Sequence, residues 1–144
     1  MYRMLIATSI LCAFTPLVNG QYVKSTEVKT LLKTTVSANG KKLVYPKVEQ
    51  PEVTVSKIVM PKGARTGWHK HNHPLFAYIL KGELTVYRKK ADPLIYKEGD
   101  AVSELVEEFH EGVNEGEEEA ILVAFYLGGD GTPLVVMEDK GKDD

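Results

Sequence analysis

The sequence predicts an all-β fold of the sandwich or barrel type. Short segments rich in β-branched and aromatic residues recur along the chain, and turns containing glycine or proline separate them. No helical period is recognisable after residue 20. A chain of 144 residues is long enough for one domain with its own hydrophobic core.

The first expected strand is Thr26–Val36, where β-branched and leucine side chains share one parity. Asn39-Gly40 follows it and is the strongest short hairpin signal in the chain. Lys42–Tyr45 is the expected return strand of that hairpin, and Pro46 ends it. The sequence therefore predicts a β-hairpin before the main body of the domain.

Further strands are expected wherever an apolar or alternating segment is bounded by turn residues. These segments are Glu52–Met60, Leu75–Leu80, Leu84–Tyr87, Leu94–Tyr96, Ala101–Val106, Ala120–Leu127 and Leu134–Met137. The glutamates between residues 104 and 119 are expected to form a solvated rim that discourages pairing at a sheet edge.

The first twenty residues are typical of a secretory signal peptide. Arg3 is the only charge before Lys24, and the apolar stretch Met4–Val18 is too short to span a bilayer as a helix. We expect cleavage after Gly20, which would make the mature protein periplasmic or extracellular. The alternative is an uncleaved N-terminal membrane anchor.

Charge and cysteine content exclude several kinds of function. The net charge of −2 offers no electrostatic basis for binding nucleic acid or an anionic membrane surface. Cys12 is the only cysteine and lies in the expected signal peptide. The mature chain would then have no disulfide, thiol nucleophile or thiolate ligand.

Most of the histidines lie close together in sequence. His69, His71 and His73 alternate, and residues i and i+2 of an extended chain point to the same face. The fourth histidine, His110, is distant in sequence. Neutral imidazole is the commonest metal ligand among side chains, so the cluster suggests a metal site. A polar, exposed histidine-rich loop would give the same pattern.

Two segments carry glycine and histidine at fixed spacings. In residues 63–82, five residues separate Gly63 from His69-x-His71, and Gly82 follows at the spacing of a known motif. In residues 99–114, Gly99, His110 and Asn114 have the spacing of a second motif. With both motifs in this order, the chain resembles the cupin family of small jelly-roll β-barrels.

The match to the two motifs is incomplete. Leu75 stands where the first motif has glutamate, and Leu105 and Glu107 stand where the second has proline and glycine. The resemblance implies a single cupin domain, a double-stranded β-helix or jelly-roll barrel, over residues 21–138, followed by a flexible tail over 139–144. It also implies a divalent metal held inside the barrel by His69, His71 and His110. Iron, zinc, manganese, nickel and copper all accept such a site, so the metal is not identified.

Several residues near the motifs are weaker candidates. His73 could be a fourth ligand, but a loop at the barrel mouth is the favoured placement. Glu104 could act as a ligand or as a partner of the ligands, although an exposed strand carboxylate is the favoured interpretation. The remaining pocket candidates are Trp68, Phe76, Tyr78 and Asn114. Asn114 is expected to hold a turn rather than contact a ligand.

The resemblance does not select one function, since one fold hosts many chemistries. We favour an exported cupin that binds a divalent metal and an unidentified small molecule, and leave catalytic turnover undecided. The alternatives are an enzyme similar to the three-histidine iron dioxygenases, or a metal-free binding or structural cupin. By analogy with cupins of this size, a homodimer that buries Glu27–Tyr45 is also expected.

Overall fold

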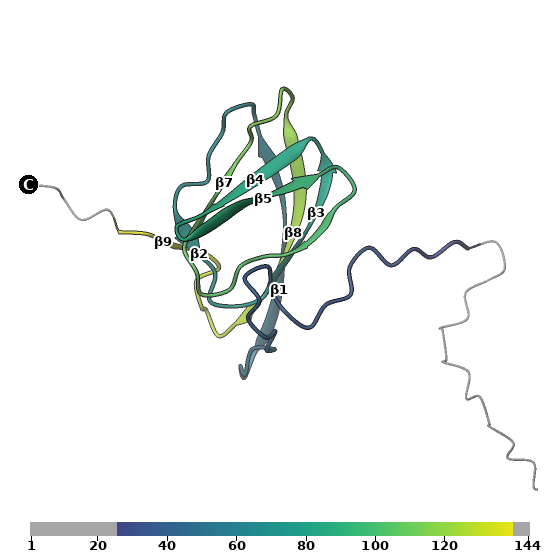
Figure 1. Cartoon of the computed structure of the whole chain (residues 1–144). Coiled ribbons are helices and arrows are strands. Elements are labelled where there is room, and N and C mark those ends of the chain that lie inside the picture. The colour runs from purple at the N-terminus through teal and green to yellow at the C-terminus, as the bar shows by residue number, and fades with distance from the viewer. Residues whose placement is uncertain (1–25, 140–144) are drawn as a thin grey trace, which may run out of the picture.

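The structure is a computed structural model that describes residues 26–139. The expected signal peptide, its expected cleavage after Gly20 and the end of the expected tail from residue 140 onward lie outside these residues. In the described part, strands form two antiparallel sheets that enclose a barrel (Figure 1). The strands are β1 (Pro51–Met60), β2 (His69–Lys70), β3 (Leu75–Lys81), β4 (Glu83–Arg88), β5 (Ala91–Lys97), β6 (Ala101–Ser103), β7 (His110–Val113), β8 (Ala120–Gly129) and β9 (Val136–Met137).

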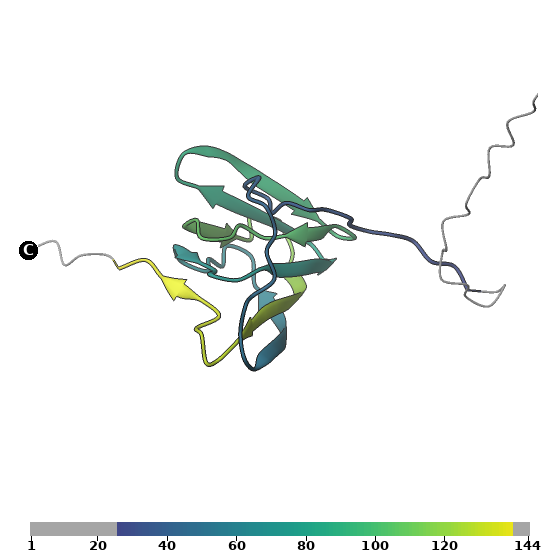
Figure 2. The same ribbon diagram turned by 90° about the horizontal axis from the view of Figure 1, so that it is seen from below.

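The strands of the two sheets are far from sequence order. One sheet has the order β1-β8-β3-β6, and the other has the order β5-β4-β7-β2-β9. Figure 2 shows the two layers from below, with the C-terminal strand at the edge of the second layer. The predicted all-β jelly-roll class is confirmed, and no helix occurs in residues 26–139.

Alternation along β1 explains how the first sheet acquires its two faces. β1 pairs with β8 from Pro51↔Gly129 to Met60↔Ala120, so same-parity side chains of both strands share a face. Ile58 and Met60 point into the barrel, whereas Val55 lies on the outer face with more than half of its surface exposed.

The core lies between the two sheets. Fully or nearly fully buried apolar side chains come from both of them, including Ile79 and Leu122 from the first sheet and Leu84 and Val86 from the second. Burial of this apolar surface is the main favourable contribution to folding. The same packing fixes the strands that carry the histidines.

Gly82 makes the tight connection between β3 and β4. It has a φ of 77°, and a Cβ there would lie 2.7 Å from the carbonyl oxygen of Glu119. Only glycine fits both the left-handed backbone and the close approach. The last position of the first motif therefore serves the backbone rather than the site.

The expected N-terminal hairpin is only partly formed. Thr26–Val36 and Lys42–Tyr45 are not strands, and a single bridge, Val36↔Lys42, joins them around the turn at Asn39-Gly40. The predicted ladder fails because most of this segment is exposed and packs on no inward-facing partner. Residue 26 lies away from the barrel, and the segment runs from there toward it (Figures 1 and 2).

Two strands were not expected from the sequence. β2 and β7 are short, and β7 contains Glu111, a charged residue of a type that is usually exposed. All of β7 is nevertheless buried, and Arg65 pairs with the Glu111 carboxylate. The expected solvated acidic rim therefore does not include Glu104 and Glu111, which are 8% and 6% exposed.

Residues 26–139 contain no helix long and apolar enough to cross a membrane.

Candidate metal centre

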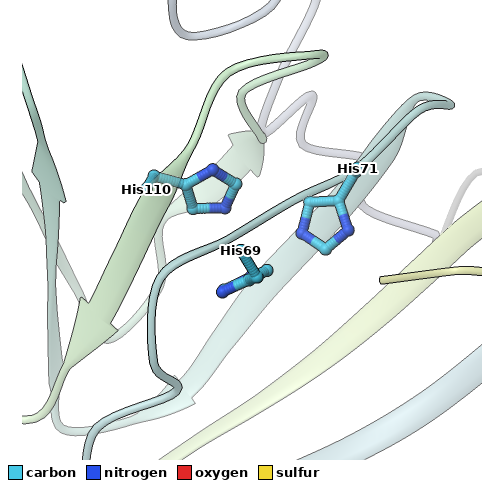
Figure 3. A group of neighbouring side chains, drawn as sticks. All are labelled: His69, His71 and His110. Carbon is cyan, nitrogen blue, oxygen red and sulfur yellow. The ribbon is translucent and has the colours of Figure 1, made fainter. Parts of the chain in front are cut away.

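Three histidines from two neighbouring strands and the segment after them meet inside the barrel. His69 lies in β2 and is the direct cross-strand partner of His110 in β7. His71 follows β2 and forms a parallel bridge with Val106. The three imidazole rings lie beside one another (Figure 3), with ring centroids 4.5 to 5.2 Å apart. All three residues are buried.

Each imidazole is oriented by a backbone carbonyl. Nδ1 of His69 lies 2.8 Å from the oxygen of Gly67, Nδ1 of His71 lies 2.9 Å from that of Leu134, and Nδ1 of His110 lies 2.8 Å from that of Glu108. A carbonyl oxygen only accepts hydrogen bonds, so Nδ1 carries the proton in all three rings. Each neutral ring therefore keeps its free lone pair on Nε2.

The arrangement fits a metal ion. One ring nitrogen from each of the three histidines lies within 4.8 Å of the other two. Nε2 of His110 is buried and has no hydrogen-bond partner in residues 26–139. A buried polar atom without a partner is unfavourable, whereas coordination of a cation would satisfy it. Metal-ligating histidines commonly donate their other ring N–H to a backbone carbonyl, as all three do here.

Burial keeps the imidazoles uncharged. Loss of solvation lowers the pKa of His69 and of His110, and it lowers the pKa of His71 to about 4. A protonated imidazole cannot bind a metal. The three rings are therefore in their ligating form at neutral pH.

Glu104 lies inside the barrel beside the histidines. The residue is 8% exposed, and its carboxylate Oε1 lies 3.8 Å from Nε2 of His110. The expectation that Glu104 is an exposed strand carboxylate is therefore wrong. Burial raises the pKa of the Glu104 carboxyl, while the backbone N–H of Leu105, which donates to Oε1, acts in the opposite direction.

A cavity of about 300 Å³ adjoins the histidines and Glu104. Apolar side chains from both sheets form most of its wall. Tyr126 of β8 and Thr66 add polar groups near the histidines. The apolar lining residues are Ile58, Met60, Leu75, Leu84, Val86, Leu122, Ala124 and Val135.

The other candidate residues lie elsewhere. His73 is not part of the histidine cluster and lines narrow crevices beside Pro74. Phe76 and Tyr78 line an outer groove on the other face of β3, because their parity is opposite to that of the inward-facing Leu75 and Ala77. The Nζ atom of Lys89 lies over the face of the Trp68 ring, 5.4 Å from the centroid of that ring.

Asn114 holds a turn, as the sequence analysis favoured. Its side-chain nitrogen donates to the carbonyl oxygens of Met60 and Glu118, and its side-chain oxygen accepts from the N–H of Gly116. Asn114 is fully buried and does not line the cavity. Its amide therefore fastens the end of β7 to the end of β1.

Sequence reasoning missed two polar groups at the site. Tyr126 shares its parity with Leu122 and Ala124, so the alternation along β8 was a usable signal for an inward position. Thr66 gave no such signal, because it lies in a loop. Its hydroxyl accepts from the N–H of Gly112 and lies 3.3 Å from Nδ1 of His69.

Comparison with known proteins supports the same family. Residues 56–126 match the family described as Cupin domain. An uncharacterized protein of Methanocaldococcus jannaschii is 34% identical over 61 residues, which cover 42% of this chain and 53% of that protein. The chain thus spans about half the length of this relative.

A solved structure shows the same architecture. A protein with a double-stranded β-helix domain from Klebsiella pneumoniae subsp. pneumoniae superposes with a TM-score of 0.51 at 20% identity, covering 67% of this chain and 91% of that one. The chain has a cupin fold. A cupin-like protein from Thermotoga maritima has a TM-score of 0.48 at 25% identity, covering 51% of this chain and 55% of that one. The domain match and the fold together support the cupin superfamily.

The departures of this chain from the two cupin motifs have structural consequences. Leu75 is buried and lines the cavity at the position where the first cupin motif carries glutamate. Leu105 is fully buried in the core, and Glu107 adopts a φ of 56° at the position of a motif glycine. The three motif histidines nevertheless meet at one point.

Proposed function

We propose that this protein is a metal-binding cupin whose ligands are His69, His71 and His110. The observation that carries the proposal is that all three Nδ1 atoms are held by backbone carbonyls, so three free Nε2 lone pairs are left in one buried cluster. A divalent ion bound there would keep open coordination positions and could polarise a bound ligand as a Lewis acid. Iron, zinc, manganese, nickel and copper all suit imidazole ligands to some degree.

The cavity favours a small, mainly apolar ligand with one polar group directed toward the histidines. Its volume of about 300 Å³ is at the lower end of the range for small-molecule sites. Polar lining groups are confined to the neighbourhood of the histidines, where Glu104, Thr66 and Tyr126 lie. None of the described residues lining the cavity is lysine or arginine. An anionic ligand would therefore depend on the metal for its positive charge.

The test is metal binding by protein purified without a polyhistidine tag. Metal-free protein is titrated calorimetrically with each of the five divalent ions, and we expect one ion per chain. His71→Ala should weaken binding by more than the ~10–100-fold that loss of an outer-shell partner costs. His73→Ala is the matched control and should bind as the wild type does, because His73 lies outside the cluster.

Two results would contradict this function. Failure of the folded wild type to take up any of the five ions would favour a metal-free binding or structural cupin. Equal losses in His71→Ala and His73→Ala would mean that the ligands are assigned wrongly. If the iron form consumes oxygen with thiols or catechols, the metal site also has catalytic activity similar to that of the three-histidine dioxygenases.

We also propose that the protein pairs with a second copy of itself. The support is apolar surface on two parts of the same chain. Val53, Val55 and Val59 of β1 and Phe125 of β8 are exposed on the outer face of the first sheet. The N-terminal segment that leaves the barrel exposes Val28, Leu31 and Leu32. Contiguous exposed apolar surface of this kind marks interaction sites.

We propose in addition that the protein is exported. The support for this proposal is the sequence of residues 1–20 alone.

A further inference from the structure

We propose that Glu104 is a fourth protein ligand of the metal, replacing from the neighbouring strand the glutamate that the first motif lacks at Leu75. The inference rests on the proposed metal-binding function. It adds a carboxylate to a donor set that the sequence motifs alone define as three neutral imidazoles.

The backbone places Glu104 directly beside Leu75. β6 pairs with β3 in an antiparallel register that includes Phe76↔Ser103, and Glu104, the residue after β6, lies opposite Leu75 where that register is continued. The N–H of Glu104 donates to the carbonyl oxygen of Leu75 at 2.9 Å. Directly opposed residues of antiparallel strands project to the same face, with Cβ atoms ~5 Å apart. Both side chains line the cavity.

A carboxylate on the residue that follows β6 can therefore enter the site at the level where cupins carry one on the partner strand. Because opposed residues project to the same face, Glu104 can supply the acid that is missing at Leu75. Leu75 fills the motif position with an apolar side chain, and its cross-strand neighbour supplies the acid. No other acidic residue among residues 26–139 lines this cavity.

The carboxylate approaches the metal-facing side of the rings. The one histidine nitrogen within 4 Å of a Glu104 carboxylate oxygen is Nε2 of His110, which lies 3.8 Å from Oε1, and it is not an Nδ1. All three Nδ1 atoms already donate to carbonyl oxygens of Gly67, Leu134 and Glu108. Glu104 is thus not needed to orient an imidazole, which is the usual role of a carboxylate outside the ligand set.

Burial without a cation is unfavourable for such a group. In residues 26–139, no lysine or arginine forms an ion pair with Glu104, and the one hydrogen bond of its carboxylate comes from the N–H of Leu105. An ionised carboxylate in an apolar cavity requires a paired charge or a metal. A divalent ion next to the three imidazoles would supply that charge, and the carboxylate would in turn offset part of the charge of the ion.

The experiment compares Glu104→Gln, which keeps the shape and removes the charge, with Glu98→Gln, an exposed glutamate on a turn. Metal affinity is measured by competition with a chelator, and coordination by the visible absorption of the cobalt(II) form. We expect Glu104→Gln to bind about 10-fold or more weakly and to change the cobalt spectrum. Glu98→Gln should match the wild type in both measurements.

A second variant tests the position of the carboxylate. In Leu75→Glu/Glu104→Leu the acid moves to the motif position across the strands. We expect this double variant to recover affinity that Glu104→Leu alone loses, because both side chains enter the same cavity. Circular dichroism and thermal unfolding establish that each variant is folded.

The outcomes separate the two proposals. If Glu104→Gln keeps wild-type affinity and spectrum while His71→Ala loses binding, the inference about Glu104 is overturned and the three-histidine site stands. If folded wild-type protein takes up no ion, both proposals fail. A weaker affinity with an altered spectrum in Glu104→Gln alone supports Glu104 as a ligand.

Discussion

His69 of β2 and His110 of β7 are direct partners in an antiparallel ladder, and their ring centroids lie 4.5 Å apart. Directly opposed residues present their side chains to one face. A single strand pair thus joins the two histidine motifs and turns two imidazoles toward the same point inside the barrel. The geometry of the site depends on the connection between β2, β7 and the loop before β2.

Thr66 is expected to stabilise that connection. Its hydroxyl accepts from the N–H of Gly112 at 2.9 Å and lies 3.3 Å from Nδ1 of His69. Thr66→Val would leave the Gly112 N–H without its acceptor, so we expect a loss of about 1–3 kcal/mol in the free energy of unfolding. We also expect weaker metal binding. Urea unfolding and metal titration measure the two effects.

Thr66→Ser is the matched control, because it keeps the hydroxyl and removes only a methyl group. It should retain most of the stability and the metal affinity of the wild type. If Thr66→Val and Thr66→Ser are equally stable and bind metal equally well, the hydroxyl has no part in fixing the site.

Asn114 is predicted to matter for stability and not for metal binding. Its side chain makes three hydrogen bonds, to the backbones of Met60, Glu118 and Gly116, and is fully buried. Asn114→Ala would leave buried backbone groups unsatisfied and should lower the free energy of unfolding by about 2–4 kcal/mol. The metal affinity of the folded fraction should be unchanged.

Guanidinium unfolding with and without metal measures both quantities. Asn72→Ala, at an exposed position in the loop after His71, is the control and should unfold as the wild type does. A stable Asn114→Ala variant with altered metal affinity would instead place Asn114 among the residues that act on the site.

The sequence predicted the long strands from local alternation, and it predicted the three-histidine cluster through the resemblance to the two cupin motifs. Alternation along 52–60 and 120–127 is visible within each segment, and motif spacing relates His69, His71 and His110. The burial of Glu104 was not predictable in this way. It follows from the pairing of β6 with β3, which no local pattern reveals.

The prediction of an N-terminal hairpin was wrong because strong local signals were not matched by tertiary packing. Its alternation and the Asn39-Gly40 turn are good local signals for a hairpin, yet only the bridge Val36↔Lys42 forms. A hairpin needs an apolar face to pack on a sheet or helix. In this structure Val44 and Tyr45 are exposed, so burial of apolar side chains does not stabilise the hairpin that the local sequence favours.

The stability of the metal-free protein should depend on pH with two opposing contributions. Burial lowers the pKa of His69, His71 and His110 below the ~6.5 of an unfolded histidine, and that of His71 falls to about 4. Between these values the unfolded chain binds protons that the folded chain excludes. The histidines therefore lower the free energy of unfolding as pH falls from 6.5 toward 4.

Glu104 acts with the opposite sign. Burial raises the pKa of its carboxyl, so the folded chain retains a proton that the unfolded chain releases, and stability is lost as pH rises above the unfolded value. In Glu104→Gln only the histidine contribution remains. We expect its free energy of unfolding to fall more steeply with acid than that of the wild type. Urea unfolding in a chelator at several pH values measures the slopes, and parallel slopes would contradict the prediction.

The outer face of the first sheet should hold the protein as a dimer. Val55 and Phe125 are direct cross-strand partners there, 56% and 40% exposed, and Phe125 also lines a groove of about 800 Å³ beside the N-terminal segment. A charge placed on this face would be desolvated in the interface, so Phe125→Lys should give monomers. Sedimentation velocity across micromolar concentrations measures the change.

Ile95→Lys is the control, because Ile95 is 56% exposed on β5 of the other sheet. It should sediment as the wild type does. Phe125 faces away from the histidines, since its neighbours Ala124 and Tyr126 line the cavity, so Phe125→Lys should retain metal affinity. A wild type that is monomeric at tens of micromolar, or a Phe125→Lys variant that remains dimeric, would show that this face is not the interface.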